Sequence, residues 1–293
     1  MTDQDWLAER FESQRTHLRA VAYRMLGSLS EADDAVQEAW IRLSRTDTSD
    51  VENLRAWLTT VVGRVCLNML RSRRTRREAP LETHVADPIV TSEGGVDPEH
   101  EALLGDSLGL ALLAVLDTLA PPERVAFVLH DVFGVPFNEI APIVGRSSAA
   151  ARQLASRGRR RVRGAPVPDA NLDVQWAVAD AFLAASRDGD FERLLAVLDP
   201  DVVVRSDGGV ARPELVSVVH GVEAVATQAM LFRRFDATRA LVNGIPGGIA
   251  RNPDGSPFAV VALTVVGGLI RSIDVLADPE RLAQMDLGHS GPS

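Results

Sequence analysis

The chain has 293 residues, of which 46% are hydrophobic and 24% charged, and its net charge is −9. This length allows two or three domains with cores of their own, and the composition is that of a folded protein. The single cysteine, Cys66, excludes a disulfide within the chain and a zinc site built on paired cysteines, and it suits a reducing compartment. No apolar run reaches the roughly 18 residues of a membrane-spanning helix.

The first residues lack the basic and apolar regions of a secretory signal, so we expect a cytoplasmic protein without contact to a membrane. The histidines show no spacing typical of a metal site. We therefore expect no metal and no cofactor.

Three helices are expected in residues 1–77. Apolar residues recur at helical spacing from Phe11 to Leu29, and Ser30 with Asp33 resembles a capping box that opens a second helix. A third helix, from about Glu52, has the most regular apolar stripe and ends in five arginines within 71–77. Composition alone would also fit an ordinary helical bundle with a solvated charged surface.

In residues 78–105, prolines and a glycine pair interrupt any helical or strand spacing of the apolar residues, which indicates a flexible linker. Helical spacing returns in 106–164, where a domain of four helices is expected. A short second linker, 165–171, follows.

Residues 136–163 indicate a helix-turn-helix with its turn at Gly145. Small residues at helical spacing, among them Ala151, Ala155 and Gly158, form the inner face of the second helix, and Ser147 or Ser148 can cap it. Its outer face is polar and basic, which suits the major groove of DNA because Arg and Gln pair bidentately with guanine and adenine. A structural three-helix unit with a solvated basic face is the alternative.

The arginines form two clusters, five within 71–77 and six within 152–163. Two clusters about eighty residues apart suggest two separate contacts with nucleic acid, since phosphate binding depends on local basic density. From Asp169 onward, 10 arginines stand against 17 acidic residues, so the C-terminal part is acidic.

Residues 172–293 have a mixed α+β pattern. A helix is expected from Leu172 to Arg187, a short one ending at Leu198, and another after Gly221. Strands are expected at 202–206, 237–243, 258–266 and 269–276, with Gly267-Gly268 as a two-residue hairpin turn. We expect a curved antiparallel sheet wrapped on helices.

Three segments carry a family resemblance: DDAVQEAWIRL, RAWLTTVVGRVCLNMLRSRR, and LAPPERVAFVLHDVFGVPFNEIAPIVGRSSAAARQLASRGRR. They resemble regions 2 and 4 of the extracytoplasmic-function (ECF) sigma factors of bacterial RNA polymerase. The part from about Leu172 is similar to the SnoaL-like cone-shaped barrel that one subgroup carries. The expected fold is therefore multi-domain: two all-α domains and a C-terminal α+β SnoaL-like barrel.

The resemblance implies a role for each of three surfaces. Residues that would dock on the β′ clamp helices of core RNA polymerase are Asp33, Asp34, Gln37, Glu38, Trp40 and Arg42. Residues that would read and melt the −10 promoter element, together with loop 46–54, are Asn53, Arg55, Arg64, Asn68, Arg71, Arg73 and Arg74. Residues that would bind the −35 element are Ser147, Ser148, Arg152, Gln153, Ser156, Arg157 and Arg160. Asn68 stands where the family commonly has Asp, so its own role stays open.

Two C-terminal motifs of the subgroup are present in variant form. They are Asp207-Gly208-Gly209 and Asp278-Pro279-Glu280-Arg281-Leu282, and 85–89 (VADPI) occupies about the place of the subgroup's linker motif. The resemblance implies that the C-terminal domain contacts region 2 and the linker and modulates sigma activity in cis, in place of a separate anti-sigma protein.

Two other functions stay open. In a one-component regulator, the barrel would sense a small-molecule ligand in its pocket and polymerase would not be a tight partner; a polymerase-docking face and a second DNA-reading helix argue against this. In an enzyme, Asp207 and His220 are the pair we would nominate, but turn formation explains Asp207 more simply. We expect a sigma factor, not an enzyme.

Overall fold

The computed structural model describes residues 3–46, 51, 53–76, 84–91, 110–164 and 167–287. The chain forms two compact units, one holding most of residues 1–78 and 115–164 and the other holding 79–97, 106–114 and 165–293. Several expected segments lie partly or wholly outside the described residues. They are most of the predicted loop 46–54, the 78–105 linker apart from 84–91, the first residues of the expected 106–164 domain, and residues 165–166.

The N-terminal part of the first unit is a helical bundle, as predicted. Its helices are α1 (Asp3–Leu26), α2 (Leu29–Leu43) and α3 (Leu54–Arg76). The capping prediction for α2 was two residues off, because Ser28 is the N-cap and its side chain accepts from Glu31 N. Cys66 is fully buried, and desolvation raises the pKa of its thiol to about 12.

Four helical segments were expected after the linker, and the structure has α5 (Leu110–Asp117), α6 (Pro121–Phe127) continued by the π-helix η1 (Val128–Val132), α7 (Phe137–Val144) and α8 (Ser148–Val162). Gly145 ends α7 in the left-handed conformation with φ 67°, and Ser147 caps α8. The predicted helix-turn-helix is therefore confirmed.

Small residues let these helices approach closely. Ala151 and Ala155 are fully buried, and a Cβ on Gly158 would lie 2.9 Å from Phe127 Cβ, so α8 packs tightly on α6. Gly63 has a similar role on α3, because its Cβ position lies 3.4 Å from Ile143 of α7. Within this unit α3 thus packs against α7.

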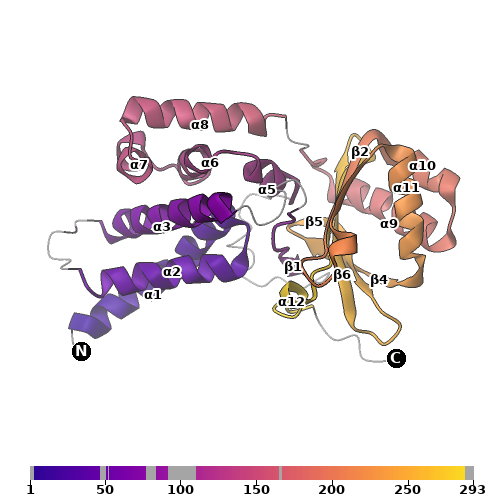
Figure 1. Ribbon diagram of the computed structural model, residues 1–293, viewed down its shortest axis with the longest axis horizontal. Coiled ribbons are helices and arrows are strands. Elements are labelled where there is room, and N and C mark those ends of the chain that lie inside the picture. Colours follow the sequence, from indigo (N-terminus) through magenta and orange to yellow (C-terminus); the bar gives the residue numbers. More distant parts are fainter. Residues whose placement is uncertain are drawn as a thin grey trace. The chain divides into compact units, whose positions relative to one another are not determined.

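The second unit is a seven-stranded sheet with helices. The helices are α9 (Leu172–Asp188), α10 (Phe191–Val197), η2 (Pro213–Leu215), α11 (Val222–Leu231), η3 (Phe232–Arg234) and α12 (Pro279–Leu282). The strands are β1 (Val90–Thr91), β2 (Leu198–Asp207), β3 (Ser217–His220), β4 (Asp236–Val242), β5 (Ile245–Arg251), β6 (Pro257–Val266) and β7 (Leu269–Leu276). Helices α9, α10 and α11 cover one side of the sheet, and α12 lies on the other (Figure 1).

The strand order is β1-β4-β5-β6-β7-β2-β3. The expectation of an antiparallel sheet holds for every pair except β2 with β7, which is parallel. Among the described strands, β1 and β3 stand at the two ends of the order and do not pair with each other. The sheet is therefore open and does not close into a barrel. Helices at Leu172 and after Gly221 and the Gly267-Gly268 turn are confirmed, whereas β1, β3 and β5 were missed.

Candidate functional sites

The outer face of α8 presents its polar residues to solvent. Every residue predicted to contact the −35 element is exposed, namely Ser147, Ser148, Arg152, Gln153, Ser156, Arg157 and Arg160. The Arg152 guanidinium lies over the Phe137 ring, 5.3 Å from its centroid, so α7 supports this side chain. The helix-turn-helix therefore carries one continuous basic and amide-bearing surface.

Two neighbouring arginines are engaged within the protein. Arg159 pairs with Asp131 at 2.5 Å, and Arg161 pairs with Glu123 at 2.8 Å. Glu123 is 7% exposed and also lies 3.8 Å from Arg157. Arg159 and Arg161 thus attach α8 to Asp131 and Glu123 through ion pairs. Arg160, which lies between them, is exposed and is not used in this way.

Along α3 the structure separates the predicted −10 residues into two groups. Arg64, Asn68, Arg71 and Arg74 are exposed at spacings of three or four, so they share one side of the helix. Arg73 is instead directed into the bundle, where its guanidinium pairs with the Glu31 carboxylate and donates to Leu26 O at 2.9 Å. The geometry makes Arg73 a structural residue that joins α3 to α2.

A hollow of about 270 Å³ lies at the start of α3 and is lined by Arg10, Ser13, Gln14, Asn53, Leu54 and Arg55. The Arg55 Nη2 atom lies 3.3 Å from His17 Nδ1. Burial and the charges of Arg55 and Arg24 lower the pKa of His17 to about 4, so at pH 7 its ring is neutral and Nδ1 accepts from Arg55. The α1 residues of this hollow were missed, because nothing in the spacing of α1 indicates which loop it faces.

The predicted docking face on α2 is mostly exposed. Asp33, Asp34, Gln37 and Arg42 are exposed, and Glu38 and Trp40 are half-buried. Asp33 pairs with Arg19 of α1 at 2.7 Å, and the Trp40 ring lies 5.1 Å from that of Phe11. Part of this face is therefore held in place by α1.

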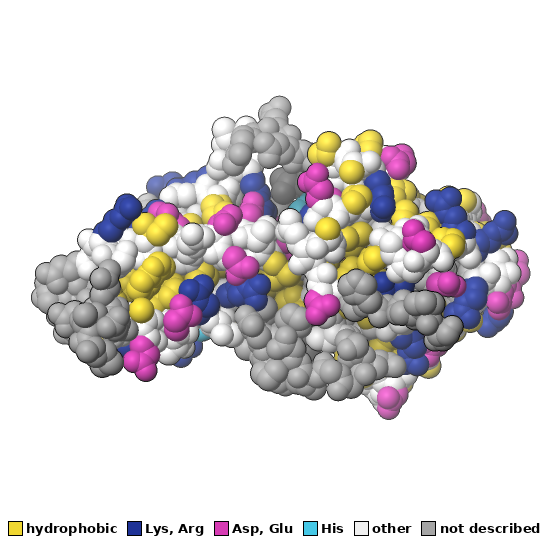
Figure 2. All heavy atoms as spheres, turned by 90° about the horizontal axis from the view of Figure 1, so that it is seen from below, with side chains coloured by type: hydrophobic (Ala, Val, Ile, Leu, Met, Phe, Trp, Pro, Cys, Tyr) yellow, Lys and Arg dark blue, Asp and Glu magenta, His cyan; other side chains and the backbone are white. Residues whose placement is uncertain are grey.

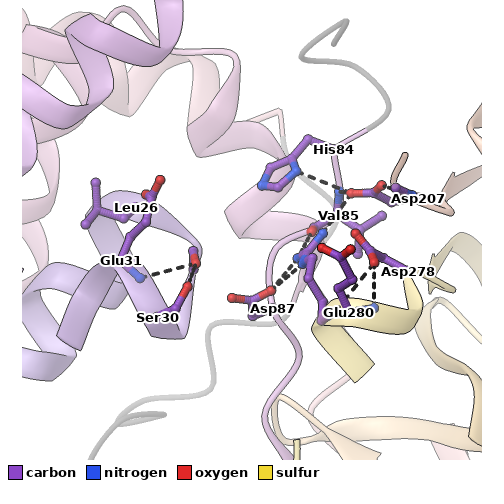
Figure 3. A network of polar contacts seen from close by, with 12 residues as sticks. Leu26, Ser30, Glu31, His84, Val85, Asp87, Asp207, Asp278 and Glu280 are labelled. Carbon is purple, nitrogen blue, oxygen red and sulfur yellow. Dashed lines mark hydrogen bonds and ion pairs between the residues drawn. The ribbon is translucent and has the colours of Figure 1, made fainter. Parts of the chain in front are cut away.

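The two C-terminal motifs meet at the segment 84–91, which lay inside the predicted linker. Arg281 of α12 donates to Asp87 Oδ1 at 2.6 Å, to Asp207 Oδ2 at 2.8 Å and to Val85 O at 2.6 Å. His84 lies 3.3 Å from the same Asp207 oxygen (Figure 3). We call His84, Val85, Asp87, Asp207 and Arg281 the Arg281 cluster.

Ile89 continues the attachment. It exchanges two hydrogen bonds with Asn243, at 2.7 and 2.8 Å, and the next two residues pair with β4 as strand β1. Residues 85–89 are all buried. This stretch of the expected linker is thus part of the C-terminal sheet.

The glycines of the first motif are required by close packing. A Cβ on Gly209, whose φ is 62°, would lie 2.1 Å from Asp278 Oδ2, and one on Gly208 would lie 2.2 Å from Arg212 O. Asp278 caps α12 by accepting from Glu280 N at 2.9 Å. The two motifs therefore form one structural unit, which the sequence spacing of about seventy residues did not indicate.

Burial alone would raise the pKa of Asp207. The hydrogen bond with His84, the charge of Arg281 and the Val85 N–H outweigh this and lower it to about 2, so Asp207 is ionised at pH 7. Its nominated partner His220 is exposed and pairs with Val203 in the sheet register, four positions from Asp207 on β2. Four residues of strand span about 13 Å, so the structure does not bring this pair together.

The described residues contain no group of three or more side chains arranged to hold a metal ion. No helix among them is both long and apolar enough to cross a membrane. Acidic and basic side chains are intermixed on the face seen in Figure 2, so the acidic excess does not gather in one patch there.

Two helices with exposed basic rows, one of them within a helix-turn-helix, are suited to contact nucleic acid, and comparison with known proteins identifies the class of protein. The Sigma-70 region 2 family matches residues 11–76, and the Sigma-70, region 4 family matches residues 109–162. The ECF RNA polymerase sigma factor SigJ of Mycobacterium tuberculosis is 38% identical over 290 residues, 92% of this chain and 91% of SigJ. The probable ECF sigma factor SigI of the same species is 35% identical, over 96% of this chain and 97% of the SigI chain.

The crystal structure of SigJ matches the fold with a TM-score of 0.75 at 34% identity, covering 96% of this chain and 100% of that chain. The chain belongs to the ECF RNA polymerase sigma factors. The expected fold class, two helical sigma domains followed by a SnoaL-like α+β domain, is confirmed, although its sheet is open.

Proposed function

We propose that the chain joins core RNA polymerase and directs initiation at promoters read by α3 and α8, under the control of its C-terminal domain. The observation that carries this is the pair of exposed basic rows, one on each of two helices from separate sigma regions. A regulator with one DNA-reading helix needs only the row on α8.

At the −35 element, the first turns of α8 would enter the major groove. Arg152, Gln153 and Arg157 are exposed there and can pair with base edges. Ser147, Ser148 and Arg160 would contact phosphates, which position the helix without reading sequence.

At the −10 element, the hollow beside Asn53 and Arg55 would hold an unstacked base. Extruding a base costs a few kcal/mol, and the exposed row of Arg64, Arg71 and Arg74 would offset part of this by holding the strand through its phosphates. Asn68 lies within that row and would contact the same strand.

The exposed side of α2 would dock on the β′ clamp helices of core polymerase, so the protein would act in the cytoplasm. Asp33 and Glu38 are already paired with Arg19 and Arg42, so docking would exchange these surface pairs for contacts with the clamp. Such pairs contribute little stability each, so exchanging them costs little.

The C-terminal domain would act in cis through the segment 84–91. The Arg281 cluster and the pairing of β1 with β4 support this, because they join the connection between the two sigma regions to the regulatory domain. Holding this connection would restrict how far regions 2 and 4 can separate. We assign the domain a regulatory and not a catalytic role, and a contact with region 2 is part of the same proposal.

The test is transcription in vitro with purified protein, core polymerase and promoter fragments from its own genome. We expect specific initiation that requires the protein. Residues 1–168 alone should keep the same promoter preference but give a different level of transcription. DNA binding without initiation would contradict the proposal and favour a ligand-sensing regulator that works apart from polymerase. Turnover of a substrate that survives deletion of residues 1–168 would instead favour an enzyme.

A further inference from the structure

A cavity of about 80 Å³ lies within the C-terminal domain, between the sheet and the helices that cover it. The helix side is formed by Phe182 and Leu183 of α9, Ala229 of α11 and Phe232 of η3. All of the lining residues belong to the second unit, so the cavity is a property of this domain alone.

The floor consists of side chains from five strands. The cross-strand pairs Ala237–Ala250, Val204–Ile273 and Val261–Val275 lie on one face of the sheet. Alanine stands in both positions of the first pair, where longer side chains would fill the space. Asp207 lies three residues beyond Val204 on β2, so alternation turns it to the opposite face. The cavity and the Arg281 cluster are therefore separate sites.

The charged side chains that line the cavity are all positive. Arg187 and Arg233 line it and are exposed, and neither guanidinium has an ion-pair or hydrogen-bond partner among the residues that the structure describes. None of the lining side chains is acidic. An apolar interior with unpaired guanidinium groups complements an apolar molecule that ends in a carboxylate.

Two polar groups on the helix side face the same space. Gln228 Oε1 is buried and has no hydrogen-bond partner, which is costly in an apolar setting. Ser186 donates its own hydroxyl hydrogen to Ala229 O at 2.8 Å, so its oxygen is left as an acceptor. A ligand with a hydroxyl or N–H donor would satisfy them.

We propose that this cavity binds a compact, mostly apolar carboxylic acid that also carries a hydrogen-bond donor, such as a hydroxylated aromatic acid. Arg187 and Arg233 hold the carboxylate at the opening. Gln228 and Ser186 accept from the donor, and the apolar floor excludes water from the ring. This goes beyond the proposed function, which requires no ligand.

The test is calorimetric titration of the full chain with 3-hydroxybenzoate, 4-hydroxybenzoate and 4-hydroxyphenylacetate. The neutral methyl esters, benzoate without a hydroxyl, and decanoate are the comparison ligands. We expect at least one hydroxylated acid to bind, at least tenfold more tightly than its ester and severalfold more tightly than benzoate. Decanoate should bind more weakly than that acid, because the cavity has no room for a long chain.

Variants at exposed positions keep the fold while changing the site. Arg187→Gln with Arg233→Gln should weaken binding of the acid at least tenfold, and Arg193→Gln, an exposed arginine outside the cavity, should leave it unchanged. Ala237→Leu should abolish binding by filling the floor, with Ala224→Leu on the exposed side of α11 as its matched control. Thermal melting of each variant confirms that it is folded.

The proposal is overturned if no acid binds at 10 millimolar, a concentration about 10⁴-fold above the Kd of a micromolar site. Equal binding of an acid and its ester, or full binding by the double arginine variant, would also overturn it. Because binding is measured without polymerase or DNA, its failure would leave the proposed function untouched.

Discussion

Arginine has opposite roles on α8 and in the Arg281 cluster. On α8, Arg152 and Arg157 extend from a helix whose inner face is small and apolar, so their guanidinium groups are exposed. Arg281 is enclosed, with two carboxylates and a carbonyl as acceptors. An exposed guanidinium can exchange water for a phosphate or a base at little cost, whereas removing an enclosed one leaves buried acceptors unpaired. Local pairing, not arginine content, separates the arginines that we propose to bind DNA from the structural ones.

The largest effect is expected for Arg281→Ala. Asp87 and Asp207 would lose their shared cation, and breaking a buried pair costs about 3–5 kcal/mol. We expect a lower melting temperature of the C-terminal domain and protease cleavage within 84–91. Arg193→Ala removes an exposed pair with Asp188 and should cost at most about 1 kcal/mol. Equal losses for the two variants would show that the cluster adds no more than a surface pair.

Gly209→Ala tests the contact between the two C-terminal motifs without removing a charge. The new Cβ would collide with Asp278 and would occupy a backbone conformation with φ 62° that favours glycine. We expect a loss of about 2–3 kcal/mol in unfolding free energy, measured by denaturant titration. Gly267→Ala is the control, because it also has a positive φ (61°) but meets nothing within 4 Å. If both variants lose the same stability, the approach of Asp278 is not what selects Gly209.

Arg157→Ala tests the exposed side of the comparison. We expect binding to a −35 fragment to weaken by about 1–3 kcal/mol if a bidentate contact with a base is lost. The melting temperature should change little, because Glu123, which lies 3.8 Å from Arg157, keeps its shorter pair with Arg161 at 2.8 Å. Arg159→Ala is the control, because Arg159 pairs with Asp131 and should affect stability more than DNA binding. Unchanged affinity of Arg157→Ala for all promoter fragments would remove this residue from the recognition surface.

The smallest effect is expected when pH is varied above 4, where Asp207 stays ionised and its contribution to stability does not change. The folded-state pKa of Asp207 is lowered from 3.8 to about 2, so its contribution to stability is fully present above the unfolded value and is lost as pH falls through about 2. Hydrogen exchange of the Val85 amide should therefore show constant protection from pH 7 to 5, after correction for intrinsic rates, and a loss of protection only below about 4. Asp207→Asn should remove that acid-dependent step.

Sequence reasoning predicted the helix-turn-helix well because its signals are local. Gly145, Ser147 and the small inner face of α8 each act within a few residues of their own position. Strand β5 was missed because Ile245-Pro246-Gly247-Gly248 has low strand propensity.

The register of the sheet explains those glycines. A Cβ on Gly247 would lie 2.2 Å from Val261 O on the neighbouring strand, so only glycine fits. The ordering of 84–91 was missed for a related reason: its partners, Asn243 and Arg281, are more than 150 residues away and leave no mark on the local pattern.

The contact between α3 and α7 through Gly63 limits the reach of the sigma regions. The two promoter elements are named for positions about 25 base pairs apart, which is about 85 Å of duplex at 3.4 Å per base pair. A compact unit of the size that holds α3 and α8 has a radius of gyration of about 14 Å, so it spans about half that distance. If α3 and α8 read both elements at once, as proposed, this contact would have to open. The free energy of packing around Gly63 would then be subtracted from that of promoter binding, and the isolated protein would bind a complete promoter less tightly than the two regions could in separation.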